Sequence, residues 1–304
     1  MVNAQEPDVV VEAVGWYPEH RPGVVAHRPS RMQVLYRFIG SGGGRGDDLY
    51  VSDATSLPPE LSDHVDEKLL YLQPLYLACS HSSSFPGVSH PPHTTAARRE
   101  LGLDPEGLYL GALNKFYKVT PTLFDAWCSI LSSVPQSRLI FVDYNHYPEA
   151  KVHLMREAES RGVARSRLVF VPEGSHSYFM KLGSALDLFL DTGHPLSNGH
   201  TTVADMLYMH VPVLTFTGPA KPSRVASSLS ISSGCTALVA NSLPDYVSIA
   251  RAALRPSFRA SLGNLCSSTG TTSSPLVAGR EVFDASFFAR RWQRGLGMAA
   301  EAAP

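Results

Sequence analysis

The sequence predicts an α/β fold built on a doubly wound parallel sheet, and two observations lead to this prediction. From Leu108 onward, short apolar runs of strand length alternate with stretches of helix length. Strands that alternate with helices at this spacing are typical of parallel sheets with helices on both faces. The chain of 304 residues is also 44% hydrophobic and 17% charged, which supplies enough apolar material for a sizeable core.

Capping and turn signals set the limits of the expected helices. Thr120 followed by Pro121 marks the start of a helix over 121–133, and Gly162 marks the end of a helix over 148–161. The other expected helices cover residues 176–185, 200–210, 223–229, 244–254 and, at the C-terminal end, 282–294. The expected strands cover residues 108–113, 138–142, 167–171, 186–191, 211–216 and 237–240.

The first eighty residues predict a smaller set of strands, over 9–14, 33–39 and 48–52, with another that begins near Leu70. A Gly-rich segment, 41–46, superficially suggests a phosphate-binding loop. It lacks the Lys and Ser/Thr that follow such a loop, so we expect a mobile loop instead. Because a strand begins so soon after the first residue, we interpret this part of the chain as an incomplete lobe.

These observations divide the chain into four expected units: a partial N-terminal lobe over 1–80, a linker over 81–106, a C-terminal lobe over 107–275, and a helix with a tail over 276–304. The linker prediction rests on a composition rich in Ser, Pro and His. His81, His90 and His93 could be proposed as metal ligands, but no carboxylate or thiolate accompanies them. A solvated linker is therefore the better interpretation.

Composition excludes several classes of function. The formal net charge is −1, so no basic field attracts nucleic acid or an anionic membrane. No apolar run approaches the ~20 residues of a membrane span, and no secretory signal is visible at the N-terminus. The four cysteines are scattered without a CxxC pair, so we expect neither a zinc site nor a disulfide framework. This usage fits a reducing compartment, either cytoplasmic or nucleocytoplasmic.

Two segments at expected strand ends carry candidate chemistry, since open parallel sheets bind ligands at the carboxyl ends of their strands. The first runs from Asp191 to the helix start at His200, Thr201 and Thr202. Free N–H groups and the helix dipole favour an anion there. Asp205, one turn later, can accept hydrogen bonds from a ribose diol. Taken alone, a simply capped helix with a chance histidine explains this stretch about equally well.

The second segment places Lys115 and Lys118 directly after the strand 108–113. Two lysines at this position could neutralise a diphosphate, although an ordinary solvated pair is the better interpretation if the segment stands alone. Together the two segments predict a nucleotide-diphosphate site without a metal. Asp187 and Asp191 do not form the closely spaced acidic pair of a metal-dependent site, and we interpret Asp187 as a paired structural carboxylate.

The order of several short motifs resembles the O-GlcNAc transferase family, which consists of inverting GT-B glycosyltransferases and includes the SPINDLY type. The motifs lie at 114–118, 134–137, 190–192, 198–202 with Asp205, 223–228, 234–235, 274–276 and 288–292. The likeness covers nearly the whole chain. It is highly specific in the C-terminal lobe and weak before Ser80.

The resemblance implies two Rossmann-like lobes with a nucleotide sugar between them, and transfer of N-acetylglucosamine from UDP-GlcNAc to Ser or Thr of protein acceptors without a metal or other cofactor. It assigns catalytic roles to Lys118, which contacts the diphosphate, and to His200. It also implies that Thr201 and Thr202 hold phosphate and sugar, while Asp205 takes the ribose. Lys115, His176 and Phe179 complete the expected donor site.

The chain departs from the family pattern at several positions. Lys115 stands where an amide is usual, and Leu182 replaces an expected Arg. Phe179 stands where the family has a His, but it could still stack on uracil. The family's glycine loop is altered over 38–44, and the resemblance places the first strands and a catalytic histidine before Met1. Two alternatives therefore remain open beside the O-GlcNAc transferase: a nucleotide-sugar-binding remnant without turnover, and a SPINDLY-type fucosyltransferase, against which His200 argues.

Overall fold

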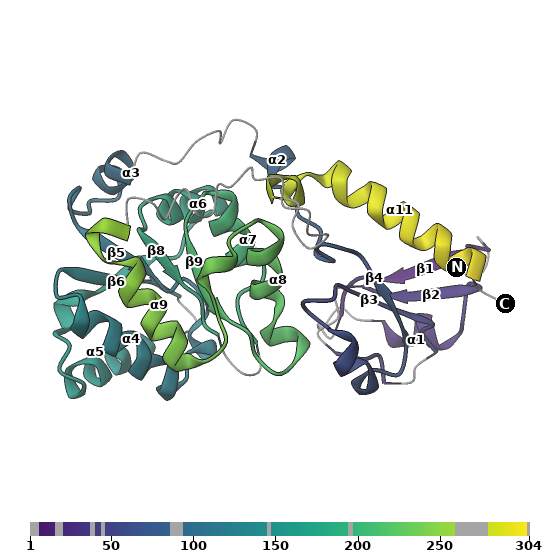
Figure 1. Ribbon diagram of the computed structural model, residues 1–304, viewed down its shortest axis with the longest axis horizontal. Helices are drawn as coiled ribbons and strands as arrows, with labels where there is room; N and C mark the ends of the chain where they lie inside the picture. The colour runs from purple at the N-terminus through teal and green to yellow at the C-terminus, as the bar shows by residue number, and fades with distance from the viewer. Residues whose placement is uncertain are drawn as a thin grey trace.

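The chain folds into two α/β lobes joined by two crossing segments (Figure 1). This computed structural model describes residues 6–15, 21–36, 40–43, 46–85, 94–144, 147–193, 197–258 and 279–302. Each lobe has its own parallel sheet, with four strands in the N-terminal lobe and six in the C-terminal lobe. The predicted fold class is confirmed in both lobes.

The C-terminal sheet has the strand order β10-β9-β8-β5-β6-β7, and every pairing in it is parallel. Its strands are β5 (Leu108–Gly111), β6 (Ser137–Asp143), β7 (Leu168–Pro172), β8 (Leu188–Leu190), β9 (Val213–Phe216) and β10 (Val239–Ala240). The chain winds outward in one direction from β5 and in the other from β8. The carboxyl ends of these two neighbouring strands therefore form the topological switch point, where such sheets bind ligands.

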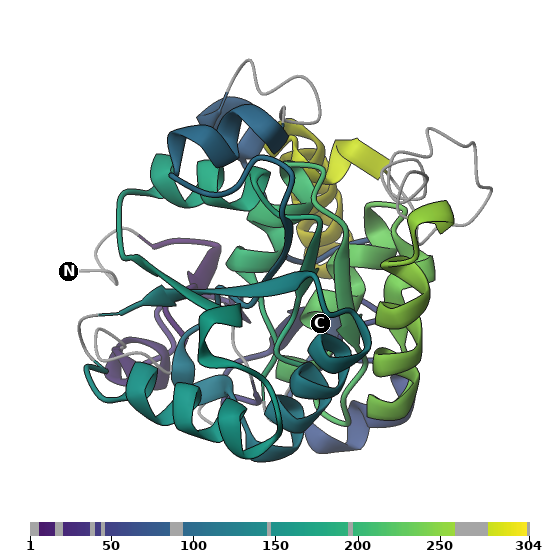
Figure 2. The same cartoon turned by 90° about the vertical axis from the view of Figure 1, so that its left-hand side faces the viewer.

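Helices cover both faces of this sheet (Figure 2). They are α4 (Pro121–Ser133), α5 (Ala150–Ser160), α6 (His176–Ser184), α7 (Thr201–Tyr208), α8 (Val225–Ser232) and α9 (Leu243–Ala253). The capping signals act as predicted, because the Thr120 hydroxyl accepts the Leu123 N–H at 3.3 Å and Gly162 adopts a positive φ of 77° after α5. The strands and helices follow one another along the chain in the predicted order. Their buried side chains form one continuous core.

The N-terminal lobe is smaller and its sheet runs in simple sequence order. Its elements are β1 (Val9–Glu12), α1 (Pro22–Ala26), β2 (Met32–Leu35), β3 (Leu49–Ser52), the 3₁₀ helix η2 (Pro59–His64) and β4 (Lys68–Tyr71). All residues of β2 are buried, whereas β1 is only partly covered. The predicted Gly-rich loop lies only in part within the described residues; there, the Gly42 N–H donates to Glu67 Oε1 at 2.6 Å.

The last helix returns to the N-terminal lobe. After the 3₁₀ helix η7 (Gly279–Phe283), α11 (Ala285–Ala302) runs back across the molecule (Figure 1). The rings of Phe288 and Trp292 pack on Tyr36 with centroid distances of 5.9 and 5.0 Å. The predicted C-terminal helix is thus confirmed, and it continues further than residue 294.

The segment predicted as a linker contains α2 (His81–Ser84) and α3 (Thr94–Glu100). Arg98 of α3 binds Asp187 at 2.6 Å and the Ala185 carbonyl at 3.0 Å. This pair confirms the structural interpretation of Asp187. The expectation of a solvated chain is wrong at His81, whose side chain is only 12% exposed. His90 and His93 lie outside the described residues, and the division into four units stays a prediction.

Four contacts from one stretch of the C-terminal lobe join the two lobes. Lys221 donates to the Val51 carbonyl and Arg224 to the Thr55 carbonyl. Ser228 donates to Asp53, and Ser232 to the Pro74 carbonyl. All four donors lie in η5 (Lys221–Ser223), in α8 or between them. Hydrogen bonds therefore join the two lobes, in addition to the apolar cluster that contains residues of both.

Two further findings bear on expectations from composition. Cys235 is buried and disulfide-bonded, so the interpretation of this residue as an ordinary buried thiol, to which its apolar and small neighbours in the sequence led, is wrong. No helix among the described ranges is both long and apolar enough to cross a membrane.

Candidate functional site

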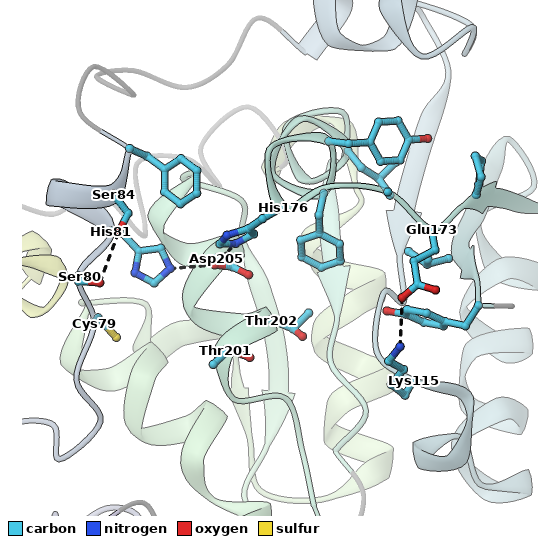
Figure 3. Close-up of a pocket in the computed structure, with 18 of the residues that line it drawn as sticks. Cys79, Ser80, His81, Ser84, Lys115, Glu173, His176, Thr201, Thr202 and Asp205 are labelled. Carbon is cyan, nitrogen blue, oxygen red and sulfur yellow. Dashed lines mark hydrogen bonds and ion pairs between the residues drawn. The ribbon is translucent and has the colours of Figure 1, made fainter. Parts of the chain in front are cut away.

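A cavity of about 600 Å³ opens at the carboxyl edge of the C-terminal sheet. The loops after β5, β6 and β7 supply one side, and α6 and α7 supply another (Figure 3). The segment 78–85, which leaves the N-terminal lobe, closes a further side. Parallel strands bring these loops to one edge of the sheet, which is why segments far apart in the sequence share this cavity.

Asp205 is the central carboxylate of the cavity. It lies in the second turn of α7 and is 7% exposed. Its Oδ1 atom is 2.8 Å from Nε2 of His81 and 3.1 Å from Nε2 of His176. Because an ionised carboxylate only accepts hydrogen bonds, both imidazoles donate from Nε2. None of the described residues bonds to the second oxygen, Oδ2.

The start of α7 presents two threonines to the cavity. Thr201 and Thr202 occupy the first helical positions and line the cavity wall. The preceding His200 occupies the N-cap position without a side-chain capping bond. Its Nε2 instead donates to the Pro222 carbonyl at 3.0 Å. The side chain of His200 therefore does not cap the first turn, whose N–H groups are suited to an anion.

A buried network holds the loop before α7 in place. Asp191, at the end of β8, accepts the Gly199 N–H at 2.8 Å and the Thr215 hydroxyl at 2.7 Å. The Asn114 amide lies 3.3 Å from the same carboxylate. A Cβ on Gly199 would come 2.6 Å from Asp191, so this close approach requires glycine. Burial raises the pKa of Asp191, and the hydrogen bonds and Lys118 oppose that rise.

The two candidate lysines both belong to the segment that follows β5, at the start and at the end of the 3₁₀ helix η3 (Phe116–Lys118). Lys118 donates to the Asn198 carbonyl at 2.6 Å, and burial lowers its pKa while Asp191 opposes the change. Lys115 lies at the cavity, 3.4 Å from Glu173 Oε1 and 3.6 Å from the centre of the Tyr144 ring. Both ammonium groups are thus held near the strand ends by a neighbouring oxygen.

The structure brings most of the predicted residues together. Those that line the cavity are Lys115, His176, Phe179, Thr201, Thr202 and Asp205. Lys118 and His200 lie beside it instead, each bonded to a backbone carbonyl. Leu182 lines the cavity but is fully buried. Their roles toward a ligand remain predictions.

Sequence reasoning missed His81 and Tyr144 as parts of this site. His81 comes from a segment that composition marked as a linker, and its partner Asp205 is 124 positions away. No local signal could have paired them. Tyr144 follows β6 directly and is 7% exposed, so the strand-end rule that selected Lys115 could have found it. Among the described residues, no three His, Cys, Asp or Glu groups gather in a metal-binding arrangement.

Comparisons with known proteins agree with this architecture. Residues 90–257 match the model of glycosyl transferase family 41. A probable UDP-N-acetylglucosamine–peptide N-acetylglucosaminyltransferase SEC of Arabidopsis thaliana is 28% identical over 81% of this chain and 25% of its own length. A UDP-N-acetylglucosamine–peptide N-acetylglucosaminyltransferase of Caenorhabditis elegans is 34% identical over 51% of this chain and 13% of its own length. The chain thus spans about a quarter or less of these curated relatives.

Solved structures show the same fold. A mutant O-GlcNAc transferase of Thermobaculum terrenum superposes with a TM-score of 0.81 at 27% identity, over 100% of this chain and 55% of that one. Anabaena HepE, solved with UDP and glucose, superposes with a TM-score of 0.61 at 12% identity, over 97% of this chain and 79% of that one, which speaks for the GT-B fold alone. The family match covers more than half of the chain, and the chain belongs to glycosyl transferase family 41.

Proposed function

We propose that the chain carries the donor site of a protein O-GlcNAc transferase, which transfers N-acetylglucosamine from UDP-GlcNAc to Ser or Thr of protein acceptors by metal-independent inverting displacement. One observation carries the proposal: the cavity at the strand ends combines an acceptor carboxylate, Asp205, with the open first turn of α7. A ribose diol needs hydrogen-bond acceptors and a diphosphate needs donors, and these two features supply one of each.

In this proposal Asp205 accepts hydrogen bonds from the ribose, assisted by His176. Phe179 offers a ring face to uracil, and Leu182 lies fully buried in the same wall. Thr201 and Thr202 donate to phosphate and sugar from the positive end of α7. These roles match what each side chain can do chemically at its place in the cavity.

The catalytic contribution in the proposal is stabilisation of the departing UDP. Lys118 holds its ammonium on the Asn198 carbonyl, two residues before His200, and a diphosphate would be a stronger, charged acceptor. The approach of that charge would also oppose the effect of burial on the Lys118 pKa. Together with His200 and Lys115, Lys118 would stabilise the charge that develops on the leaving oxygen, by about 2–4 kcal/mol for one such donor.

Calorimetric titration with UDP, UDP-GlcNAc, GDP and GDP-fucose, in the presence of EDTA, tests this proposal. We expect micromolar binding of the uridine ligands and much weaker binding of the guanosine ligands. Preference for GDP-fucose would instead favour the alternative of a SPINDLY-type fucosyltransferase. Absence of binding by the folded chain would contradict the proposal.

A second measurement separates an enzyme from a nucleotide-sugar-binding remnant. Transfer of radiolabelled GlcNAc to a Ser/Thr-containing peptide would be followed with and without Mg²⁺. We expect equal transfer in both conditions. Binding of UDP-GlcNAc without transfer to any acceptor tried, or hydrolysis alone, would favour the remnant.

A further inference from the structure

His81 is the feature of the cavity that the proposed roles do not yet use. It lies in α2, on the segment that leaves the N-terminal lobe, whereas its partner Asp205 lies in the C-terminal lobe. The contact of 2.8 Å is the shorter of the two imidazole contacts to Asp205 Oδ1. An element from outside the C-terminal sheet thus determines the surroundings of the carboxylate at the centre of the cavity (Figure 3).

The imidazole of His81 is fixed in its orientation. Its ring packs at 5.1 Å from the Tyr208 ring and edge-on at 5.5 Å from the Phe283 ring. The side chain is 12% exposed, whereas that of His176 is 55% exposed. His81 is therefore the more enclosed of the two imidazoles, and aromatic packing holds its ring next to Asp205.

Among the described residues, the side chain of His81 hydrogen-bonds to Asp205 alone. Nε2 donates to Oδ1, and the other ring nitrogen, Nδ1, is buried without a partner among the described residues. Burying a polar nitrogen without a partner is unfavourable, so packing and the single bond to Asp205 must hold the ring in place. With both imidazoles on Oδ1, Oδ2 is left without a partner in the described part of the chain.

We propose that His81 is a positioning residue for nucleoside recognition: it anchors Oδ1 of Asp205, so that Oδ2 is held ready to accept hydrogen bonds from the ribose hydroxyls of the donor. The inference rests on the proposed function and names a residue that Asp205 needs for its part. His81 itself touches no substrate in this scheme. Its effect reaches the ligand only through the orientation of the carboxylate.

Binding of UDP and of 2′,3′-dideoxy-UDP, measured by calorimetry on wild type and variants, tests this inference. Hydrogen bonds to a charged acceptor correspond to roughly a 10- to 100-fold preference for UDP in the wild type. We expect His81→Ala to reduce that preference about fivefold or more, while affinity for the dideoxy ligand stays within about twofold. A purely structural role would weaken both ligands by the same factor and would overturn the inference.

A matched pair of variants keeps the test sharp if alanine disturbs folding. In His81→Gln the amide nitrogen can reach the place of Nε2, whereas in His81→Asn it reaches only the place of Nδ1. We expect the Gln variant to keep most of the ribose preference and the Asn variant to lose it. Equal preference in the two variants would overturn the inference.

The outcome for the wild type separates this inference from the proposed function. If the wild type does not bind UDP, the proposed function and the inference both fail. If it binds both ligands equally, the ribose role of Asp205 fails and His81 has nothing to position. If it prefers UDP and His81→Ala prefers it as strongly, only the inference fails.

Discussion

Each lobe has a buried aspartate directly after one of its strands, and the two aspartates have different structural roles. Asp53 follows β3 in the N-terminal lobe and Asp191 follows β8 in the C-terminal lobe, and both are fully buried. Asp53 accepts the Ser56 N–H, the Tyr76 N–H and, across the interface, the Ser228 hydroxyl. Asp191 accepts from Gly199 and Thr215 within its own lobe. One carboxylate joins two lobes, and the other shapes the loop in front of α7.

This difference teaches that a buried aspartate at a strand end is not by itself a sign of a binding site. Burial raises the pKa of both groups, and hydrogen bonds oppose that rise in both. What separates them is the segment that each holds. The network of Asp191 ends one residue before His200, whereas that of Asp53 ends on α8 at the interface.

The largest expected effect comes from removing either aspartate. Asp191→Ala and Asp53→Ala each leave two or more buried donors without an acceptor, so we expect each to lower the free energy of unfolding by about 3 kcal/mol. Urea unfolding gives this value, and hydrogen exchange shows which lobe is loosened. In the folded fraction, Asp191→Ala should weaken UDP binding more than about tenfold, and Asp53→Ala should change it less than about twofold. Equal effects on UDP binding would contradict the different roles of the two aspartates.

The next effect concerns the interface and depends on pH. Lys221 is 4% exposed, donates to the Val51 carbonyl and lies 3.8 and 4.3 Å from the centres of the Tyr50 and Tyr76 rings. Burial lowers its pKa to about 7, and Asp53 opposes the change. Between this value and the ordinary lysine pKa, the unfolded chain binds a proton that the folded chain does not, so stability rises with pH.

Comparison of wild type with Lys221→Met isolates this dependence. The free energy of unfolding of the wild type minus that of the variant should increase by about 2 kcal/mol from pH 7 to pH 9. Urea unfolding at pH 7, 8 and 9 measures it, and Lys115→Met serves as the control because its side chain is 42% exposed. A difference that is flat or falls with pH would contradict a neutral Lys221.

A smaller effect is expected from Lys118→Ala, which removes one charge-assisted contact to the diphosphate. We expect UDP affinity to fall by roughly tenfold or more, and affinity for uridine, which has no phosphate, to stay unchanged. Calorimetry on both ligands measures this. Unchanged affinity for UDP in a folded variant would refute the role of Lys118.

The smallest effect is expected from Lys115→Ala, matched by Lys151→Ala. Both side chains are 42% exposed, and each lies near one carboxylate and one aromatic ring. Exposed pairs of this kind contribute little to stability, about 0–1 kcal/mol, so thermal melting should hardly change in either variant. Only Lys115→Ala should weaken UDP, by about threefold. A loss of UDP affinity of the same size in both variants would contradict a role of Lys115 in UDP binding.

The order of strands and helices in the C-terminal lobe could be predicted from the sequence. In the C-terminal lobe, capping at Thr120 and Gly162 and the apolar strands fix each element locally, so the order of elements was predicted correctly. The rule that parallel sheets bind ligands at the carboxyl ends of their strands also selected Lys115, Thr201 and Asp205, because parallel topology determines which loops meet. The order of elements could be predicted because the sequence signals and the spatial neighbours follow one repeating pattern, and the roles of the three site residues stay predictions.

What could not be predicted are contacts that leave this pattern. His81 reaches Asp205 across 124 positions, and Lys221 reaches Val51 across 170. In both cases one partner lies in a segment whose composition indicates only a loop. The amphipathic C-terminal helix was predicted, but its apolar face does not say which lobe it covers.

The return of α11 also sets an order in which the molecule can be completed. Tyr36 and Leu72 are synthesised well before α11, yet Trp292 and Gly295 of α11 cover them. Domains generally fold as they emerge during synthesis, but this lobe must wait with part of its apolar surface uncovered until the last helix arrives. Of the two lobes, the one that is synthesised earlier is therefore completed later, and its apolar surface is exposed to aggregation during that interval.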